Sequence, residues 1–143
     1  MCLVTRNQTP NIAKEDIRVY KIMHVVKPSN GDESGVYGVP PYYPFRGYRY
    51  HEGLNKPIEE NTTPKEVGSS KTSSKRYLIE EGYLHAFVDW QSAYRRLEFM
   101  LEGCEVPYYY SIAMMRIPAG ATYYIGNEHD IAASALYWNP EEQ

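Results

Sequence analysis

The sequence predicts an α+β domain in which a mainly antiparallel sheet carries one principal helix, at about residues 89–102, on one face. Runs of β-branched and aromatic residues recur along the chain, and only one stretch has apolar residues at clear helical spacing. The 143 residues are 43% hydrophobic and 23% charged, which is typical of a globular protein. We therefore expect a single domain spanning residues 1–143.

The first long strand is expected at Ile17–Val26, "IRVYKIMHVV", where Val19, Lys21 and Met23 share one face. Residues 27–35 collect Pro, Ser, Asn and Gly, which predict a reversal of the chain. Residues 39–53, "VPPYYPFRGYRYHEG", contain three prolines that favour an extended path, so we expect a rigid loop leading into a strand near residues 48–52.

Residues 55–76 contain only two sizeable apolar side chains, Ile58 and Val67. That is too little buried surface to repay the entropy of ordering 22 residues. The sequence therefore predicts a flexible loop here, within the single domain.

The principal helix is expected within residues 89–103, "DWQSAYRRLEFMLEG". Its predicted packing face consists of Trp90, Ala93, Tyr94, Leu97 and Leu101. Asp89 is suited to cap the first free amides, and Gly103 to end the helix in a left-handed conformation.

The C-terminal part predicts more strands. Residues 106–118 and 121–126 are expected to form two of them, interrupted by Pro118 and Gly120. The apolar run at residues 131–138 fits either a strand or a short helix. In the turn "NEHD", residues 127–130, the spacing is not that of metal ligands, and we expect a polar connection between strands.

Composition and short motifs restrict location and partners. A net charge of −3 argues against nucleic acid, and no apolar run approaches the roughly 18 residues that span a bilayer. The N-terminus "MCLVTRNQTP" does not have the pattern of a secretory signal, and two cysteines are too few for a disulfide scaffold, so we expect a cytoplasmic protein. Since the sequence has no GxGxxG, P-loop, CxxC or GxSxG motif, no cofactor and no metal are predicted.

The aromatic segment is the leading candidate for binding. We expect a pocket or surface for a small molecule or a protein, formed by Tyr42, Tyr43, Arg46, Tyr48, Tyr50 and His85. An RNA-binding sheet is disfavoured, because "RGYRYHEG" matches only the first three positions of the relevant motif.

Two residues are candidates for catalysis. Removal of Met1 would expose Cys2 as an N-terminal nucleophile, although packing as a small hydrophobic residue is the simpler interpretation. His85 in "GYLHAF" shares a strand face with Tyr83 and Phe87 directly before the helix, where it can act as an acid or base, or be a hydrogen-bonded structural group.

Four short motifs carry a resemblance that spans most of the chain: "CL" at Cys2, "VYK" at Val19, "EEGYLHAF" at Glu80 and "IPAGATYYIG" at Ile117. Together they resemble a group of small uncharacterised proteins from bacteria and their phages, which implies no particular activity. The layout of strands and helix is also similar to that of ADP-ribosyltransferases. The chain has no Glu-x-Glu or Gln-x-Glu pair and no Ser-Thr-Ser strand, so this likeness concerns the fold alone.

The sequence thus favours a non-enzymatic binding or accessory module, of bacterial or phage origin, that binds its partner through a tyrosine-rich pocket or surface. The alternative is a small enzyme, a transferase or hydrolase that uses His85 or Cys2.

Overall fold

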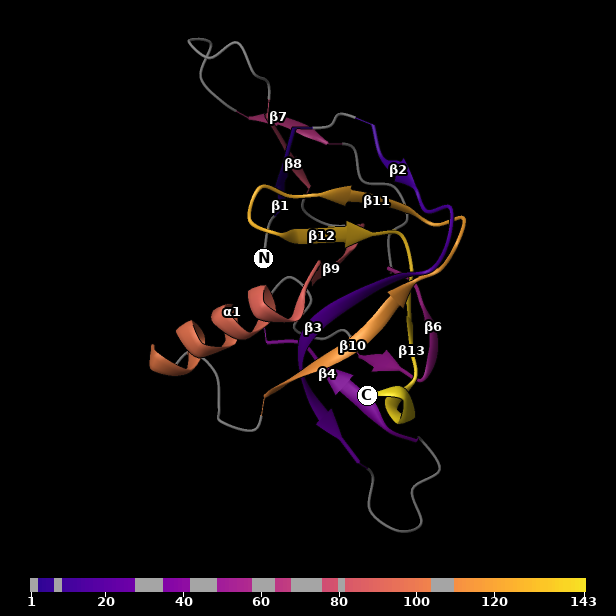
Figure 1. The fold of residues 1–143 in the computed structure, drawn as a ribbon, viewed down its shortest axis with the longest axis vertical. Coiled ribbons are helices and arrows are strands. Elements are labelled where there is room, and N and C mark those ends of the chain that lie inside the picture. The colour runs from indigo at the N-terminus through magenta and orange to yellow at the C-terminus, as the bar shows by residue number, and fades with distance from the viewer. Residues whose placement is uncertain are drawn as a thin grey trace.

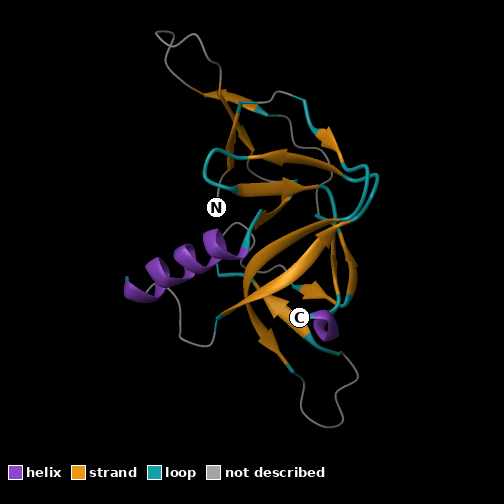
Figure 2. Cartoon of the chain, in the orientation of Figure 1, coloured by secondary structure: helices purple, strands orange, loops and turns teal. Residues whose placement is uncertain are grey.

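The computed structural model describes residues 3–6, 9–27, 35–41, 49–57, 64–67, 76–79, 82–103 and 110–143. Among these residues every strand pairing is antiparallel, and one principal helix packs against the sheet (Figure 2). The predicted α+β class is therefore confirmed.

The large sheet has the neighbour order β2-β11-β12-β9-β3-β10-β13-β6, and β4 pairs with both β3 and β5 (Figure 1). Its strands are β2 (Asn11–Ile12), β3 (Ile17–Val26), β4 (Tyr37–Val39), β5 (Tyr50–His51), β6 (Gly53–Asn55), β9 (Leu84–Phe87), β10 (Ser111–Ile117), β11 (Thr122–Ile125), β12 (Asp130–Ala133) and β13 (Leu136–Trp138). The predicted strand Ile17–Val26 is confirmed, and the ambiguous run at residues 131–138 forms strand residues of β12 and β13.

Strand β3 organises this sheet because it changes partner along its length. Its first seven residues pair with β10, and its last three pair with β4, which confirms the expected chain reversal. Strand β4 pairs with β5, and β6 follows β5 after Glu52 and pairs with β13. The sheet therefore curls back on itself around a shared core.

The corner between β5 and β6 is fixed by Gly53 and Asn55. Gly53 has a φ of 99°, a left-handed conformation that glycine adopts without strain. The Asn55 side chain accepts the His51 N–H at 2.8 Å and donates to the His51 carbonyl at 2.9 Å. These two hydrogen bonds connect the start of the corner to its end.

The inner face of this curled sheet forms the main core. Its largest fully buried members include Val19, Met23, Tyr50, Met115 and Trp138. The alternation predicted for β3 is confirmed, since Val19, Lys21 and Met23 are all buried on this face.

Helix α1 (Trp90–Glu102) begins as predicted. The Asp89 carboxylate accepts the Ser92 N–H at 2.7 Å and so satisfies one of the free amides of the first turn. The prediction for Gly103 is wrong, because its φ is −79° and its N–H donates to the Phe99 carbonyl at 3.1 Å. An ordinary helical hydrogen bond, instead of a left-handed residue, thus ends α1.

The packing face of α1 is only partly the predicted one. Ala93, Leu97 and Met100 are buried, against Ile22 and Phe87 of the sheet. Trp90, Tyr94 and Leu101 were expected on that face but are exposed. The small Ala93 side chain lets the helix backbone approach the sheet, so the bulkier rings lie at the rim of the contact.

A second sheet has the order β1-β8-β7, formed by β1 (Leu3–Thr5), β8 (Arg76–Ile79) and β7 (Lys65–Val67). Leu3 and Ile79 pack with Tyr124 and Ala132 of the large sheet. Strand β7 lies within the span 55–76, whose remaining parts at 58–63 and 68–75 are outside the described residues. The expected flexible loop stays a prediction for those parts.

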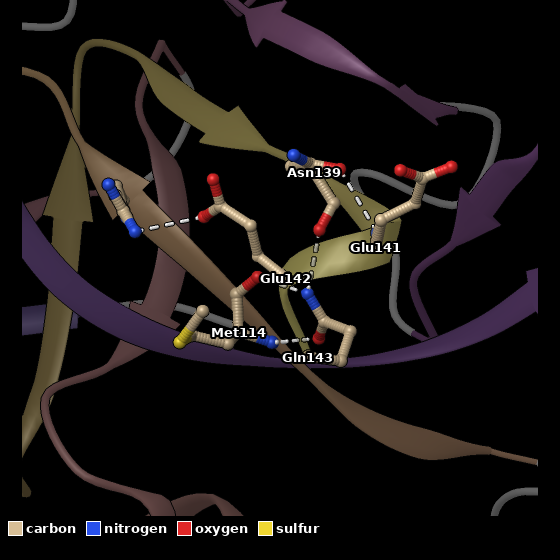
Figure 3. A network of polar contacts seen from close by, with 6 residues as sticks. Met114, Asn139, Glu141, Glu142 and Gln143 are labelled. Atoms are coloured by element: carbon tan, nitrogen blue, oxygen red, sulfur yellow. Dashed lines mark hydrogen bonds and ion pairs between the residues drawn. The ribbon is translucent and has the colours of Figure 1, made fainter.

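The C-terminus is attached to the backbone of strand β10 by polar contacts (Figure 3). After the short 3₁₀ helix η2 (Pro140–Glu142), the Gln143 amide accepts the Met114 N–H at 2.6 Å and donates to the Met114 carbonyl at 3.1 Å. Arg116 and Glu142 form an ion pair at 2.9 Å. In the described part of the chain, no helix has the length and apolar character needed to cross a membrane.

Candidate functional site

Most of the predicted binding residues fall outside the described part of the chain. These are Tyr42, Tyr43, Arg46 and Tyr48, together with the candidate nucleophile Cys2. Their roles stay predictions. Tyr50 and His85 are described, and both are buried.

His85 lies on β9, opposite Ala132 of β12, and is 3% exposed. Tyr83 and Phe87, which were expected on its face, are buried in the clusters that flank it. An acid or base must come within hydrogen-bond distance of its substrate, and such burial leaves little surface for that contact. The placement favours the structural interpretation of His85 over the catalytic one.

Tyr50 is completely buried and belongs to the main core. Its ring faces the Lys21 ammonium group, whose Nζ atom lies 4.9 Å from the ring centroid. Tyr50 therefore contributes to the interior of the curled sheet, in contact with a cation, and not to an exposed binding surface.

Lys21 is an unusual group in this core, because it is 7% exposed and surrounded by apolar residues of the inner face. Its Nζ donates to the His85 carbonyl at 2.5 Å. Desolvation lowers the pKa of Lys21 to about 7, since burial disfavours the charged form. The amine can therefore change its protonation state near neutral pH.

The alternation of the strand predicts the correct face for Lys21 but does not mark the residue as a functional candidate. The available signal was a lysine between Val19 and Met23 in an alternating apolar strand. Such a residue interrupts the expected pattern, and buried ionisable groups with shifted pKa values are frequent at functional sites.

Among the residues that the structure describes, the most exposed aromatic side chain is Phe99 of α1, at 59%, and the same helix carries a stacked pair of half-exposed rings. We define the α1 aromatic stripe as Trp90, Tyr94 and Leu101. The Trp90 and Tyr94 rings are 49% and 46% exposed and stack on each other, with centroids 4.9 Å apart and an interplanar angle of 14°. Leu101 continues the same side of the helix two turns further on. The stacked pair is thus a pre-ordered apolar surface, with Leu101 further along the same side of the helix.

The predicted polar turn is confirmed for residues 127–129, which lie between β11 and β12, whereas Asp130 is the first residue of β12 and is buried. Among the residues with described placement, no group of three or more His, Cys, Asp or Glu side chains is arranged to hold a metal ion.

Comparison of the chain with protein-family models, with curated proteins and with solved structures finds no match. The resemblance to small bacterial and phage proteins stays a prediction.

Proposed function

We propose that the chain is a non-enzymatic protein-binding module whose α1 aromatic stripe docks in an apolar groove of a partner protein. The observation that carries this proposal is that the apolar stripe of α1 is wider than the face with which the helix packs on its own sheet. Ala93, Leu97 and Met100 suffice to attach the helix, which leaves the stacked rings available.

The composition of the stripe suits a protein interface. Tryptophan and tyrosine are enriched among the residues that dominate binding energies, because they offer large contact area and lose few rotamers. Positions i and i+4 of one helix face, which Trp90 and Tyr94 occupy, are also among the anchors used when a helix binds in a groove. Stacking of Trp90 on Tyr94 fixes both rings before binding, which lowers the entropic cost of association.

A protein fits this surface better than a nucleic acid. The helix carries two arginines, Arg95 and Arg96, and two glutamates, Glu98 and Glu102, so its charges offset each other. With a net charge of −3 on the whole chain, the long-range attraction that binding to a nucleic-acid backbone requires is missing. An accessory protein of bacterial or phage origin is compatible with this function.

The enzymatic alternative rests on His85 or Cys2. His85 has little accessible surface, as described above, and Cys2 lies outside the described residues. Stoichiometric alkylation of Cys2 near neutral pH that abolishes an activity would favour the alternative, whereas a Cys2→Ala variant with unchanged binding would favour the binding module.

The proposal can be tested by site-specific photo-crosslinking in cells. A photoreactive phenylalanine analogue replaces Tyr94 in one variant and Tyr137 in a matched control. Tyr137 is similarly exposed, at 39%, but lies on β13, well separated from α1 (Figure 1). We expect a discrete crosslinked partner from position 94 and none of the same mass from position 137.

The crosslinked partner is then purified and titrated with the full chain. We expect Trp90→Ala to weaken its affinity by about 10- to 100-fold, as for a central interface aromatic. The neighbouring exposed residue gives the control, Arg95→Ala, which should leave affinity within about two-fold. Equal crosslinking from both positions, or an affinity that Trp90→Ala does not change, would contradict the proposal.

A further inference from the structure

Two arginines lie near each other at one end of the small sheet. In the β1–β8 pair, Thr5 is opposite Tyr77, Arg6 directly follows β1, and Arg76 is the first residue of β8. Like charges that lie side by side are destabilising. An anion between the two guanidinium groups would remove this repulsion.

Both arginines line one hollow of about 610 Å³. Its lining residues are Val4, Arg6, Arg76, Asn127, Glu128 and Asp130. The volume is within the range of roughly 300–1,000 Å³ that is usual for small-molecule sites. Among the residues that the structure describes, no hydrogen bond or ion pair occupies either guanidinium group.

The opposite wall is the turn between β11 and β12, and it is held firmly in place. The Asn127 N–H donates to the Val4 carbonyl at 3.0 Å, which attaches the turn to β1. The buried Asp130 carboxylate accepts the Glu128 N–H at 3.3 Å, and a Cβ atom at position 126 would clash with that carboxyl group. The turn therefore presents Asn127 and Glu128, both exposed, on a rigid support.

We propose that this hollow binds a phosphorylated sugar, with its phosphate between Arg6 and Arg76 and its hydroxyl groups toward Asn127 and Glu128. Guanidinium groups bind phosphate oxygens through paired, charge-assisted hydrogen bonds, and two of them match the charge of a phosphate monoester. The Glu128 carboxylate is a pure acceptor, which suits sugar hydroxyls, and the carboxyl groups of Glu128 and Asp130 in the same lining disfavour a phosphate on their side of the hollow. This site is separate from the α1 aromatic stripe and does not depend on the function proposed for it.

The probe is ribose 5-phosphate, titrated into the full chain by calorimetry and by amide NMR. We expect saturable binding with shifts at the Asn127 and Glu128 amides, weaker binding of inorganic phosphate, and none of ribose. Arg6→Gln and Arg76→Gln should each weaken ribose 5-phosphate at least about ten-fold, since each removes charge-assisted hydrogen bonds. Arg95→Gln on α1 is the matched control and should bind within about two-fold of the wild type.

Thermal unfolding gives a second, independent measurement. Ribose 5-phosphate should raise the Tm of the wild type and leave that of Arg76→Gln unchanged, because only a ligand that binds the folded state stabilises it. No saturation at 10 mM ribose 5-phosphate (roughly the weak limit for a specific site), or equal losses in Arg95→Gln and Arg76→Gln, would overturn the proposal.

Discussion

The inner face of β3 carries a buried charged side chain, whereas the outer side of α1 carries exposed apolar rings. On β3, Lys21 lies in the core between Val19 and Met23, where an apolar side chain is expected. On α1, the Trp90 and Tyr94 rings are half exposed although they are large and apolar. Charges are seldom buried, whereas exposed apolar groups are common on protein surfaces, so the two departures do not have the same free-energy cost.

The two costs differ in kind. Burial of Lys21 opposes folding directly, because the ammonium group loses hydration and gains one hydrogen bond and one aromatic contact. The exposed rings of α1 cost little in the isolated chain, but they leave apolar area that a partner can cover. Stability measurements should therefore detect the first region strongly and the second hardly at all.

The largest expected effect is that of Lys21→Met. A pKa of about 7 in the folded state, against 10.5 unfolded, corresponds to about 5 kcal/mol below pH 7, at about 1.4 kcal/mol per pH unit. The variant also loses the hydrogen bond to His85 and the contact with Tyr50, together worth about 2 kcal/mol. Chemical denaturation at pH 6 should therefore show Lys21→Met to be more stable than the wild type by about 3 kcal/mol.

The same comparison has a defined pH dependence. Below pH 7 the amine is protonated in both states and the full cost is present, whereas between pH 7 and 10.5 only the unfolded state holds the proton. Wild-type stability from this group therefore rises with pH, and the advantage of Lys21→Met should shrink by about 1.4 kcal/mol per unit above pH 7. A constant difference between pH 6 and pH 9 would show that Lys21 does not titrate in the folded protein.

The inner side of α1 gives the next largest effect. Leu97→Ala removes a buried side chain that packs with Ile22 and Phe87, and we expect a loss of about 2 kcal/mol in the free energy of unfolding. Urea denaturation followed by circular dichroism measures it. A loss below about 0.5 kcal/mol would mean that the helix is not anchored by this face.

Capping of α1 should have a smaller effect. Asp89→Ala removes the acceptor for the Ser92 N–H and should lower the free energy of unfolding by about 1 kcal/mol. Hydrogen bonds from Ser92 lower the pKa of Asp89, so this stabilisation is present above the unfolded pKa and is lost as the pH falls through the lower folded value. Denaturation at neutral pH should therefore separate Asp89→Ala from the wild type, and strongly acidic conditions should bring the two together.

These regions also show which features the sequence could predict. Alternation predicted the limits of β3 and put Lys21 on the face of Val19, because side chains in a strand alternate regardless of their chemistry. Helical spacing predicted the limits of α1, yet it could not determine which part of a broad apolar stripe the sheet covers. That depends on how closely Ala93 allows the helix to approach strands distant in sequence.

The arginine pair shows a further limit. Arg6 and Arg76 are 70 positions apart, and only the register of β1 on β8 brings them together. No local pattern marks either residue, since single exposed arginines are common. Periodicity and short motifs concern residues that are close in the sequence, so they cannot predict which distant strands pair.

The smallest expected effect on stability is that of the α1 aromatic stripe itself. Tyr94→Ala removes a half-exposed ring whose described ring contact is the stack on Trp90, which is worth about 0.5–1 kcal/mol. Part of that loss is offset by alanine's higher helix propensity, so the free energy of unfolding should fall by about 0.5 kcal/mol. Urea denaturation of Tyr94→Ala beside Leu97→Ala, one turn apart on the same helix, measures the contrast directly. A loss for Tyr94→Ala equal to that for Leu97→Ala would mean that the stripe is part of the fold's own packing, and the surface would then have no excess apolar area to offer a partner.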